Sequence, residues 1–311
     1  MNNELKYQVC NWNEYNQSLI KRGSLQLWVD EKTISEWLCT NGSVNGKFAR
    51  KYSDVCIECG IRIKAMYNLP WRAVQGFLQS IMAMLKIDLD VPNYSTFCRR
   101  VQSMTPVLEK ETSDENMIIA IDSTGLKVFG EGEWKVRTHG YNFRRVWRKL
   151  HLAIDVKTQQ IEAVAFSTND FKDGELLDDL LDQIKTPIDQ VVADGGYESF
   201  ENYASVQSVG AEPIIPPRVD AKIKQHGNTK AKPLARDEVV RARNKTTSKQ
   251  WKIKNGYHIR SLVETAMFRF QSLFGSTLSA KKFDSQLTEI IEKCSMMNKL
   301  TLLGMPDSKM I

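Results

Sequence analysis

Three acidic residues lie where a carboxylate could take part in chemistry. Asp122 follows the apolar run 118–121, and Asp194 follows the apolar residues 191–193. Both runs predict buried strands, and small, turn-forming residues come directly after both acids. A buried ionised carboxylate is costly unless it is paired or binds a metal ion. The alternative for either position taken alone is an Asp that starts a turn or caps a helix.

The third acid lies in segment 256–275, whose spacing predicts a long helix. At 100° per residue, one narrow face of that helix carries four polar or charged residues. They are Tyr257, Arg260, Glu264 and Gln271. An apolar stripe lies beside that face and consists of Val263, Met267, Phe270 and Phe274. The pattern therefore predicts one isolated Glu at the border of core and surface, with an Arg one turn before it.

The elements between these acids predict a particular fold class. Two further strands, 150–156 and 161–166, are joined by a polar turn, so the first three strands are expected to be antiparallel. A helix over 173–184 precedes the strand that ends at Asp194. With the late helix, this is the element order of the ribonuclease-H-like fold. We therefore predict an α/β catalytic domain with a mixed sheet flanked by helices.

In that fold, neighbouring strand ends and a covering helix bring such acids together. We therefore expect Asp122, Asp194 and Glu264 to form one catalytic and metal-binding site. Three oxygen-donating carboxylates suit Mg²⁺ or Mn²⁺. Two ions a few Å apart could hold the attacking and leaving oxygens of a phosphodiester.

The N-terminal part of the chain predicts a separate, mainly helical domain. Residues 52–103 show helical spacing in three segments, and the last of these carries Arg99 and Arg100. The polar stretch 104–117, which contains Pro106, is typical of a linker. Domain boundaries of 1–110 and 111–311 follow. The three helices resemble a helix-turn-helix DNA reader, and a plain helical bundle with solvated arginines explains them equally well.

Two segments are rich in basic residues. In 134–151, which includes Arg148 and Lys149, basic residues alternate with aromatic ones; DNA contact or a solvated hairpin would both produce this pattern. The second, at about 218–254, holds twelve Lys or Arg residues against three acids. It predicts either a solvated or disordered loop or an inserted loop that contacts nucleic acid. Its candidate contacts for DNA are Lys249, Trp251 and Lys252.

Composition limits the class of protein. The net charge of +6 favours an anionic partner. No signal peptide and no apolar stretch of membrane-spanning length is apparent, so a cytoplasmic protein without a membrane partner is expected. Cys56 and Cys59 are the only two cysteines close together in the sequence, and there is no second such pair to complete a set of four ligands. A zinc site is therefore not expected, and a reducing compartment fits.

Five motifs in the right order resemble those of one family. They are DSTGLK beginning at Asp122, DGGY beginning at Asp194, Y-x2-R-x3-E ending at Glu264, WRKLHLA beginning at Trp147 and P-x-YST beginning at Pro92. These motifs are similar to the signatures of bacterial insertion-sequence transposases with a DDE triad, above all those of the large family numbered five. The resemblance extends from about residue 10 to 306, nearly the whole chain.

The resemblance implies a transposase that binds the terminal inverted repeats of its element, cleaves phosphodiester bonds and joins the 3′ ends to target DNA. Two Mg²⁺ or Mn²⁺ ions would be held by the three acids, with Asp122 bridging both. Tyr257 and Arg260 would position the scissile strand. Double-stranded DNA is the implied partner, the active complex would contain two or more copies, and the protein would act at the bacterial nucleoid.

One departure and two alternatives stand beside this hypothesis. The family often has a Lys seven residues after the Glu, where this chain has Gln271. One alternative is a non-catalytic DNA-binding regulator derived from a transposase. The other is an aspartyl-phosphate phosphatase with Asp122 as nucleophile, which normally needs a second acid two residues later, where Thr124 stands.

Overall fold

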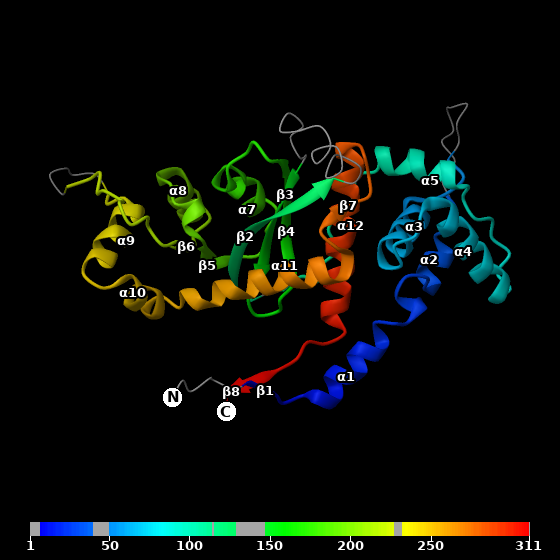
Figure 1. Ribbon diagram of the computed structural model, residues 1–311, viewed down its shortest axis with the longest axis horizontal. Coiled ribbons are helices and arrows are strands. Elements are labelled where there is room, and N and C mark those ends of the chain that lie inside the picture. Colours follow the sequence, from blue (N-terminus) through cyan, green and yellow to red (C-terminus); the bar gives the residue numbers. More distant parts are fainter. Residues whose placement is uncertain (1–6, 40–49, 114, 129–146, 227–231, 311) are drawn as a thin grey trace, which may run out of the picture. The chain divides into compact units, whose positions relative to one another are not determined.

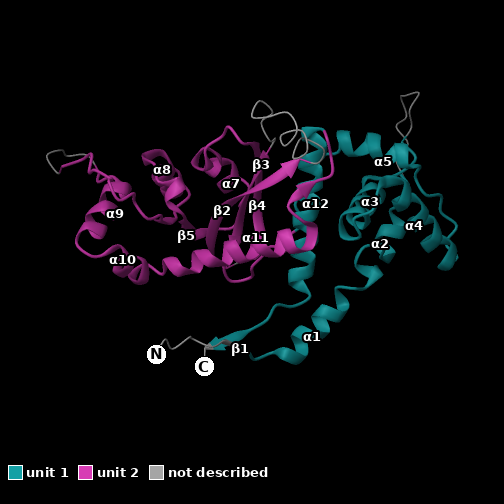
Figure 2. Cartoon of the chain, viewed as in Figure 1, with its two compact units in different colours: residues 1–109, 282–311 teal, residues 110–281 magenta. Residues whose placement is uncertain are grey.

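The chain folds into two compact units, coloured separately in Figure 2. One unit combines residues 1–109 with 282–311, and the other comprises 110–281. The computed structural model describes residues 7–39, 50–113, 115–128, 147–226 and 232–310. The first boundary between the units lies between Glu109 and Lys110. The second boundary differs from the sequence-based expectation, because the last 30 residues return to the first unit instead of completing the catalytic domain.

The first unit is mainly helical. The three helices expected over 52–103 are present, and short polar caps begin two of them. Ser53 accepts a hydrogen bond from the backbone N–H of Cys56, and Asn93 accepts one from that of Ser95. The elements of this unit are β1 (Tyr7–Val9), α1 (Trp12–Lys21), η1 (Leu25–Leu27), α2 (Glu31–Ser35), α3 (Asp54–Met66), α4 (Trp71–Met84), α5 (Tyr94–Arg100), η2 (Val101–Ser103), α12 (Phe283–Leu302) and β8 (Ser308–Met310).

Helix α12 belongs to the first unit because it packs against α3. Arg62 of α3 donates to the buried Glu292 at 2.8 Å and to Glu109 at 2.6 Å. The hydroxyl of Ser295 accepts from the backbone N–H of Glu109. Many side chains of α12 are buried, Cys294 and Met297 among them, so the helix needs partners around most of its circumference.

The second unit is built on a mixed sheet with the order β4-β3-β2-β5-β6. Strands β2, β3 and β4 are antiparallel, β5 and β6 run parallel to β2, and β7 pairs with the far end of β2. This is the ribonuclease-H-like order that the sequence predicts. The strands are β2 (Met117–Val128), β3 (Trp147–Asp155), β4 (Ile161–Thr168), β5 (Ile188–Ala193), β6 (Glu212–Ile214) and β7 (Thr277–Leu278).

Helices cover both faces of this sheet. On one face, Ile119 and Ile121 join the side chains of α7 and α8 in one apolar core. On the other face, α11 lies across β2 and β3 (Figure 1). Because strand side chains alternate between faces, Asp122 and Thr124 lie on the α11 side. The helices of this unit are η3 (Asp173–Leu176), α7 (Leu177–Leu181), η4 (Gly195–Tyr197), α8 (Phe200–Ser208), α9 (Ala235–Asn244), α10 (Ser248–Lys254), η5 (Tyr257–Arg260) and α11 (Ser261–Phe274).

The basic segment 218–254 is partly helical, which differs from the loop that its composition predicts. Its anchors are two buried residues at the start of α9. Arg236 pairs with the buried Glu198, and Asp237 accepts hydrogen bonds from the backbone N–H groups of Lys224 and Gln225. These contacts satisfy the buried charges and hold the segment against α8, so most of its other basic side chains remain on the surface.

In the described part of the chain, no helix is both long enough and apolar enough to cross a membrane.

Candidate active site

Asp122 lies in the middle of strand β2 and not at its end, which corrects the expectation from the sequence. The strand continues to Val128 because its antiparallel ladder with β3 continues as far as Lys127. Only the parallel ladder with β5 stops early, at the pair Ile121 and Ala193. Asp122 is therefore the first residue of β2 that no longer pairs with β5. Its Oδ1 accepts a hydrogen bond from the backbone N–H of Ser123 at 2.8 Å.

Asp194 directly follows β5, as predicted, and caps the short helix η4. Its Oδ1 accepts a hydrogen bond from the backbone N–H of Gly196 at 2.7 Å. A Cβ atom on Gly196 would lie 2.8 Å from that same oxygen, closer than van der Waals contact allows. The motif needs glycine at this position because the turn brings its backbone against the carboxylate.

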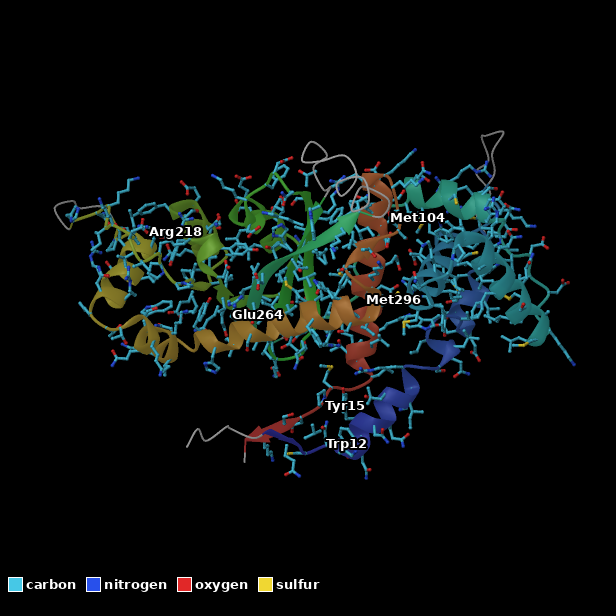
Figure 3. The ribbon with its side chains drawn as sticks, in the orientation of Figure 1. Trp12, Tyr15, Met104, Arg218, Glu264 and Met296 are labelled. Atoms are coloured by element: carbon cyan, nitrogen blue, oxygen red, sulfur yellow. The ribbon has the colours of Figure 1, made fainter. Side chains whose placement is uncertain are left out.

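Glu264 comes from α11, and a separate turn precedes that helix. Gly256, with φ of +63°, ends the preceding segment, and η5 carries Tyr257 and Arg260. The Arg260 guanidinium donates to Asp122 Oδ2 at 2.8 Å and also pairs with Glu264. Glu264 is labelled on the α11 ribbon in Figure 3. The long single helix expected from the sequence is thus divided into η5 and α11. Glu264 is linked to Asp122 of β2 through Arg260.

The electrostatics place Asp194 in the same region. Burial is the largest cause that raises the pKa of Asp122, and the charges of Asp194 and Glu264 raise it further. The Ser123 N–H and Arg260 act in the opposite direction. Burial also raises the pKa of Tyr257, and Asp122, Asp194 and Glu264 all add to that rise. Tyr257 and Asp122 therefore each lie within electrostatic range of the other acids.

The three acids are not arranged around a common metal position in this structure. Within the described residues, no group of three or more His, Cys, Asp or Glu side chains is arranged to hold a metal ion. Instead, the Arg260 guanidinium lies against Asp122 and Glu264 as a stand-in cation. The donor set itself suits a hard divalent ion, since it consists of carboxylate oxygens that already attract a positive charge.

The other candidates for DNA contact divide into exposed and engaged residues. Arg99, Lys249 and Lys252 are exposed. Arg100 does not point outward as expected, because it donates to the backbone oxygen of Tyr52 and pairs with Asp54. This arrangement ties α5 to the start of α3.

The strand β3 and the helix α10 supply the remaining candidates. Lys149 pairs with Asp173 at 3.0 Å, and Arg148 is half-buried. Trp251 is only 4% exposed, packed with Val192 and Ile214. The expectation that Trp251 contacts DNA is therefore wrong in this structure, because its ring completes the core beneath α10. Residues 134–146 of the basic hairpin lie outside the described part of the chain.

Comparison with known families identifies the family of the chain. A family model described as "Transposase DDE domain" matches residues 114–299, more than half of the chain, and a second model with the same description matches 20–131. The chain belongs to the DDE transposases. Both models carry this general description, so the finer resemblance of this transposase to the family numbered five stays a prediction.

One solved structure gives a weaker similarity. The structure titled "Drosophila P element transposase strand transfer complex" matches 88% of this chain and 84% of that one, with 12% identity and a TM-score of 0.32. The fold of this transposase is assigned from its sheet topology and not from this similarity.

Two polar contacts of this transposase were not predicted from the sequence. Gln271 donates from Nε2 to Thr124 Oγ1 at 2.9 Å, so it joins α11 to β2 two residues after Asp122. On the opposite face of the sheet, His151 Nδ1 lies 3.3 Å from the Tyr197 hydroxyl. A histidine between Leu150 and Leu152, in the apolar part of β3, was the available signal for the second contact.

Proposed function

We propose that this DDE transposase binds the terminal inverted repeats of its insertion sequence, cleaves phosphodiester bonds there and transfers the 3′ ends to target DNA. One observation supports this most strongly. Arg260 pairs with Asp122 and Glu264. The charges of Asp122, Asp194 and Glu264 all add to the rise that burial causes in the pKa of Tyr257. Two-metal phosphodiester chemistry needs carboxylates that come together around the ions, and these three come from neighbouring strands and a covering helix.

Asp122, Asp194 and Glu264 would hold Mg²⁺ or Mn²⁺, and two ions are expected. In each aspartate, Oδ1 accepts a hydrogen bond from a backbone N–H group, which orients the carboxylate. Oδ2 of Asp122 is held by Arg260, which would have to move before an ion could bind that oxygen. When bound, the ions would lower the pKa of the attacking water and stabilise the leaving oxygen. The chain itself contributes the orientation of Asp122 and Asp194 and the partly buried setting of Asp122.

Arg260 and Tyr257 would hold the scissile strand. A guanidinium forms bidentate hydrogen bonds with a phosphate as readily as with a carboxylate, so Arg260 could exchange its present partners for DNA. Tyr257 lies beside it, with Arg260 Cζ 5.9 Å and Lys252 Nζ 5.0 Å from the ring centroid. A phosphate entering here would meet two cations and one phenol hydroxyl.

Further basic residues would bind the rest of the DNA. Lys249 and Lys252 on α10 would contact the backbone, together with Arg148 and Lys149 on β3. Arg99 on α5 would contribute to end recognition by the helix-turn-helix-like region. The number of copies in the active complex and the location at the nucleoid stay predictions.

The two alternatives lose support on specific grounds. A phosphatase would need a second acid near Thr124, and the Thr124 hydroxyl instead accepts a hydrogen bond from Gln271. A non-catalytic regulator would not need an arginine that pairs with two of the three acids. DNA binding without cleavage would favour the regulator.

The test is the nicking of a supercoiled plasmid that carries the element ends, with and without Mg²⁺. Asp122→Asn, Asp194→Asn and Glu264→Gln keep the side-chain size and remove the charge that a divalent ion needs. Each should abolish nicking while DNA-end binding and folding remain. Asp189→Asn is the matched control, since Asp189 is an exposed acid bonded to Asn116. A triad variant that nicks within about tenfold of the parent, a gap of about 1.4 kcal/mol, would show that its residue is not a ligand.

A further inference from the structure

Tyr197 ends the turn that begins with Asp194, and its ring is buried in the core of the second unit. The side chain is 1% exposed and packs in the apolar cluster that includes Ile121 and Ala153. A tyrosine hydroxyl in such a place needs a polar partner. The partner here is His151 Nδ1, at 3.3 Å.

His151 comes from the strand that pairs with the strand of Asp122. It is fully buried, and its backbone lies opposite Ser123, while the next residue, Leu152, lies opposite Asp122. Because side chains alternate along β3, His151 lies on the face of the sheet that α7 and α8 cover. The contact therefore reaches the Asp194 turn from the face opposite the acids.

Between Asp194 and Tyr197, the turn has no side chain that could anchor it to the sheet. Its two central residues, Gly195 and Gly196, have no side chains and no strong conformational preference. The Tyr197 backbone donates to the Asp194 carbonyl at 3.2 Å, and its own carbonyl accepts from Asn202 at 2.8 Å. These backbone bonds shape the turn, whereas the Tyr197 side chain joins it to the sheet.

The His151–Tyr197 contact is between two neutral groups. Burial lowers the pKa of His151 to about 4, and burial also raises the pKa of Tyr197. A neutral imidazole can accept or donate at Nδ1, so either tautomer can pair with a phenol hydroxyl. Among the described residues, the Tyr197 hydroxyl is the partner found for this ring, and Nε2 has none. Loss of the hydroxyl would leave a buried imidazole unsatisfied.

We propose that His151 and Tyr197 are positioning residues that hold the Asp194 turn in place beside Asp122. The inference rests on the proposed role of Asp194 as a metal ligand. Neither side chain would touch the substrate. Both would fix the position of Asp194 through the backbone of the turn. A displacement of about 1 Å at a catalytic group can cost about 100-fold in rate, so a loose turn would have a large effect.

The test compares two tyrosines of the same core. Tyr197→Phe removes the hydroxyl that contacts His151. Tyr203→Phe is the matched control, because Tyr203 is also 1% exposed and donates to the backbone oxygen of Ile215 at 2.6 Å. Both variants lose one buried hydrogen bond, and only the first should affect Asp194.

Three readouts are measured in the full-length chain: amide exchange of residues 194–198, Mn²⁺ affinity and Mg²⁺-dependent nicking at saturating DNA. Tyr197→Phe and His151→Leu should each speed exchange about fivefold or more, weaken Mn²⁺ binding several-fold and lower kcat about 10- to 100-fold. The DNA Kd should stay unchanged. The double variant should be no worse than the worse single one, because both remove the same contact.

A conservative variant adds a rescue arm. His151→Asn keeps a hydrogen-bonding group near the position of Nδ1, so it should recover part of the kcat that His151→Leu loses. Tyr203→Phe should keep kcat within about twofold of the parent, even if it lowers the melting temperature as much as Tyr197→Phe does.

The outcomes separate this inference from the proposed function. If the parent chain does not nick DNA, the proposed function fails, and amide exchange still decides whether His151 and Tyr197 hold the turn. If the parent nicks and Tyr197→Phe matches Tyr203→Phe in exchange, Mn²⁺ affinity and kcat, the positioning role is overturned. Additive effects of the two substitutions would overturn it as well.

Discussion

Arg260 occupies the place where a divalent ion would be expected to act. Its guanidinium pairs with Asp122 and Glu264, and it lies beside Tyr257. One guanidinium offsets about half of the charge of two carboxylates, and it would have to leave them before a metal ion could bind both. The same residue is thus a competitor of the metal and a candidate contact for phosphate.

This dual position predicts opposite effects on binding and activity. Arg260→Ala should raise the Mn²⁺ affinity of the DNA-free protein by about tenfold, or about 1.4 kcal/mol. It should lower nicking, because the phosphate contact is lost. Electron paramagnetic resonance of free and bound Mn²⁺ measures the affinity directly.

The control for Arg260 is a neighbouring cation. Lys252 lies over the same Tyr257 ring and has no ion pair of its own within the described residues. Lys252→Ala should change the Mn²⁺ affinity by less than Arg260→Ala does. Equal effects would mean that general electrostatics, and not direct competition, governs metal binding. Weaker binding in Arg260→Ala would contradict the idea.

Gln271 gives a second prediction at the scale of single residues. Its amide donates to Thr124, so the side chain stabilises the contact between α11 and β2. Gln271→Lys should lower the free energy of unfolding by about 1 kcal/mol, the usual value of one hydrogen bond. If this face reaches DNA, as the family Lys implies, the added charge should steepen the slope of log K against log salt by about one unit.

A neutral variant separates the two effects of Gln271→Lys. Gln271→Met keeps a similar length without charge, so it should lower stability and leave the salt slope unchanged. An unchanged slope in both variants would mean that this face of α11 does not contact DNA.

At the scale of elements, the insert 218–254 combines an anchored base with a basic surface. Glu198 and Asp237 hold its first helix, and Lys249, Lys252 and Lys254 of α10 are exposed. Replacing the three lysines with Gln should flatten the slope of log K against log salt by up to about three units, because each phosphate contact contributes about 0.9. Filter binding over a salt series measures this slope.

A lysine outside the insert serves as the reference. Lys185 is exposed and donates to the backbone oxygen of Asp182, in the segment before β5. Lys185→Gln should leave the slope unchanged. An unchanged slope in the triple variant would show that α10 is a solvated helix.

At the scale of the whole molecule, the chain leaves the first unit and returns to it. One buried ionic network joins these distant parts. Arg62 lies within 3.7 Å of Glu58 and pairs with Glu109 and Glu292. Lys299 of α12 lies 3.9 Å from Glu109 as a second cation. A fragment ending near residue 110 would lack Glu292 and all of α12. End recognition is therefore better tested in the full chain.

This network predicts a pH dependence of stability. Burial raises the pKa of Glu58 to about 7 from 4.5, and the charge of Glu292 adds to the rise while Arg62 opposes it. The folded protein therefore binds more protons than the unfolded chain between about pH 4.5 and 7, and its stability should fall as pH rises through that window. Glu58→Gln should remove this part of the pH dependence.

Urea unfolding at several pH values between 5 and about 8 would measure the effect. Glu58→Gln should be more stable than the parent at the upper end of the range and similar to it at the lower end. Glu115→Gln is the control, since Glu115 is exposed and pairs with Lys157 at the surface. A parent whose stability rises with pH through this window would contradict the assignment of Glu58.

The sequence by itself predicted most of the helices and strands that the described chain forms. The three N-terminal helices and the order of the strands agree with the expectation, because the period of apolar residues is a local property. Asp194 also follows its strand as expected, since the apolar run and the glycines after it are adjacent in the chain. These features do not depend on distant residues.

Only the tertiary structure decided what each face packs against. Ladder pairing with β3 carried β2 past Asp122, and core packing buried Trp251 in place of exposing it. Arg100 turned inward to Asp54, and α12 joined the first unit. The pairing of Arg260 with Asp122, 138 residues away along the chain, has the same origin. Such contacts depend on which distant surfaces meet, and local patterns carry no record of that choice.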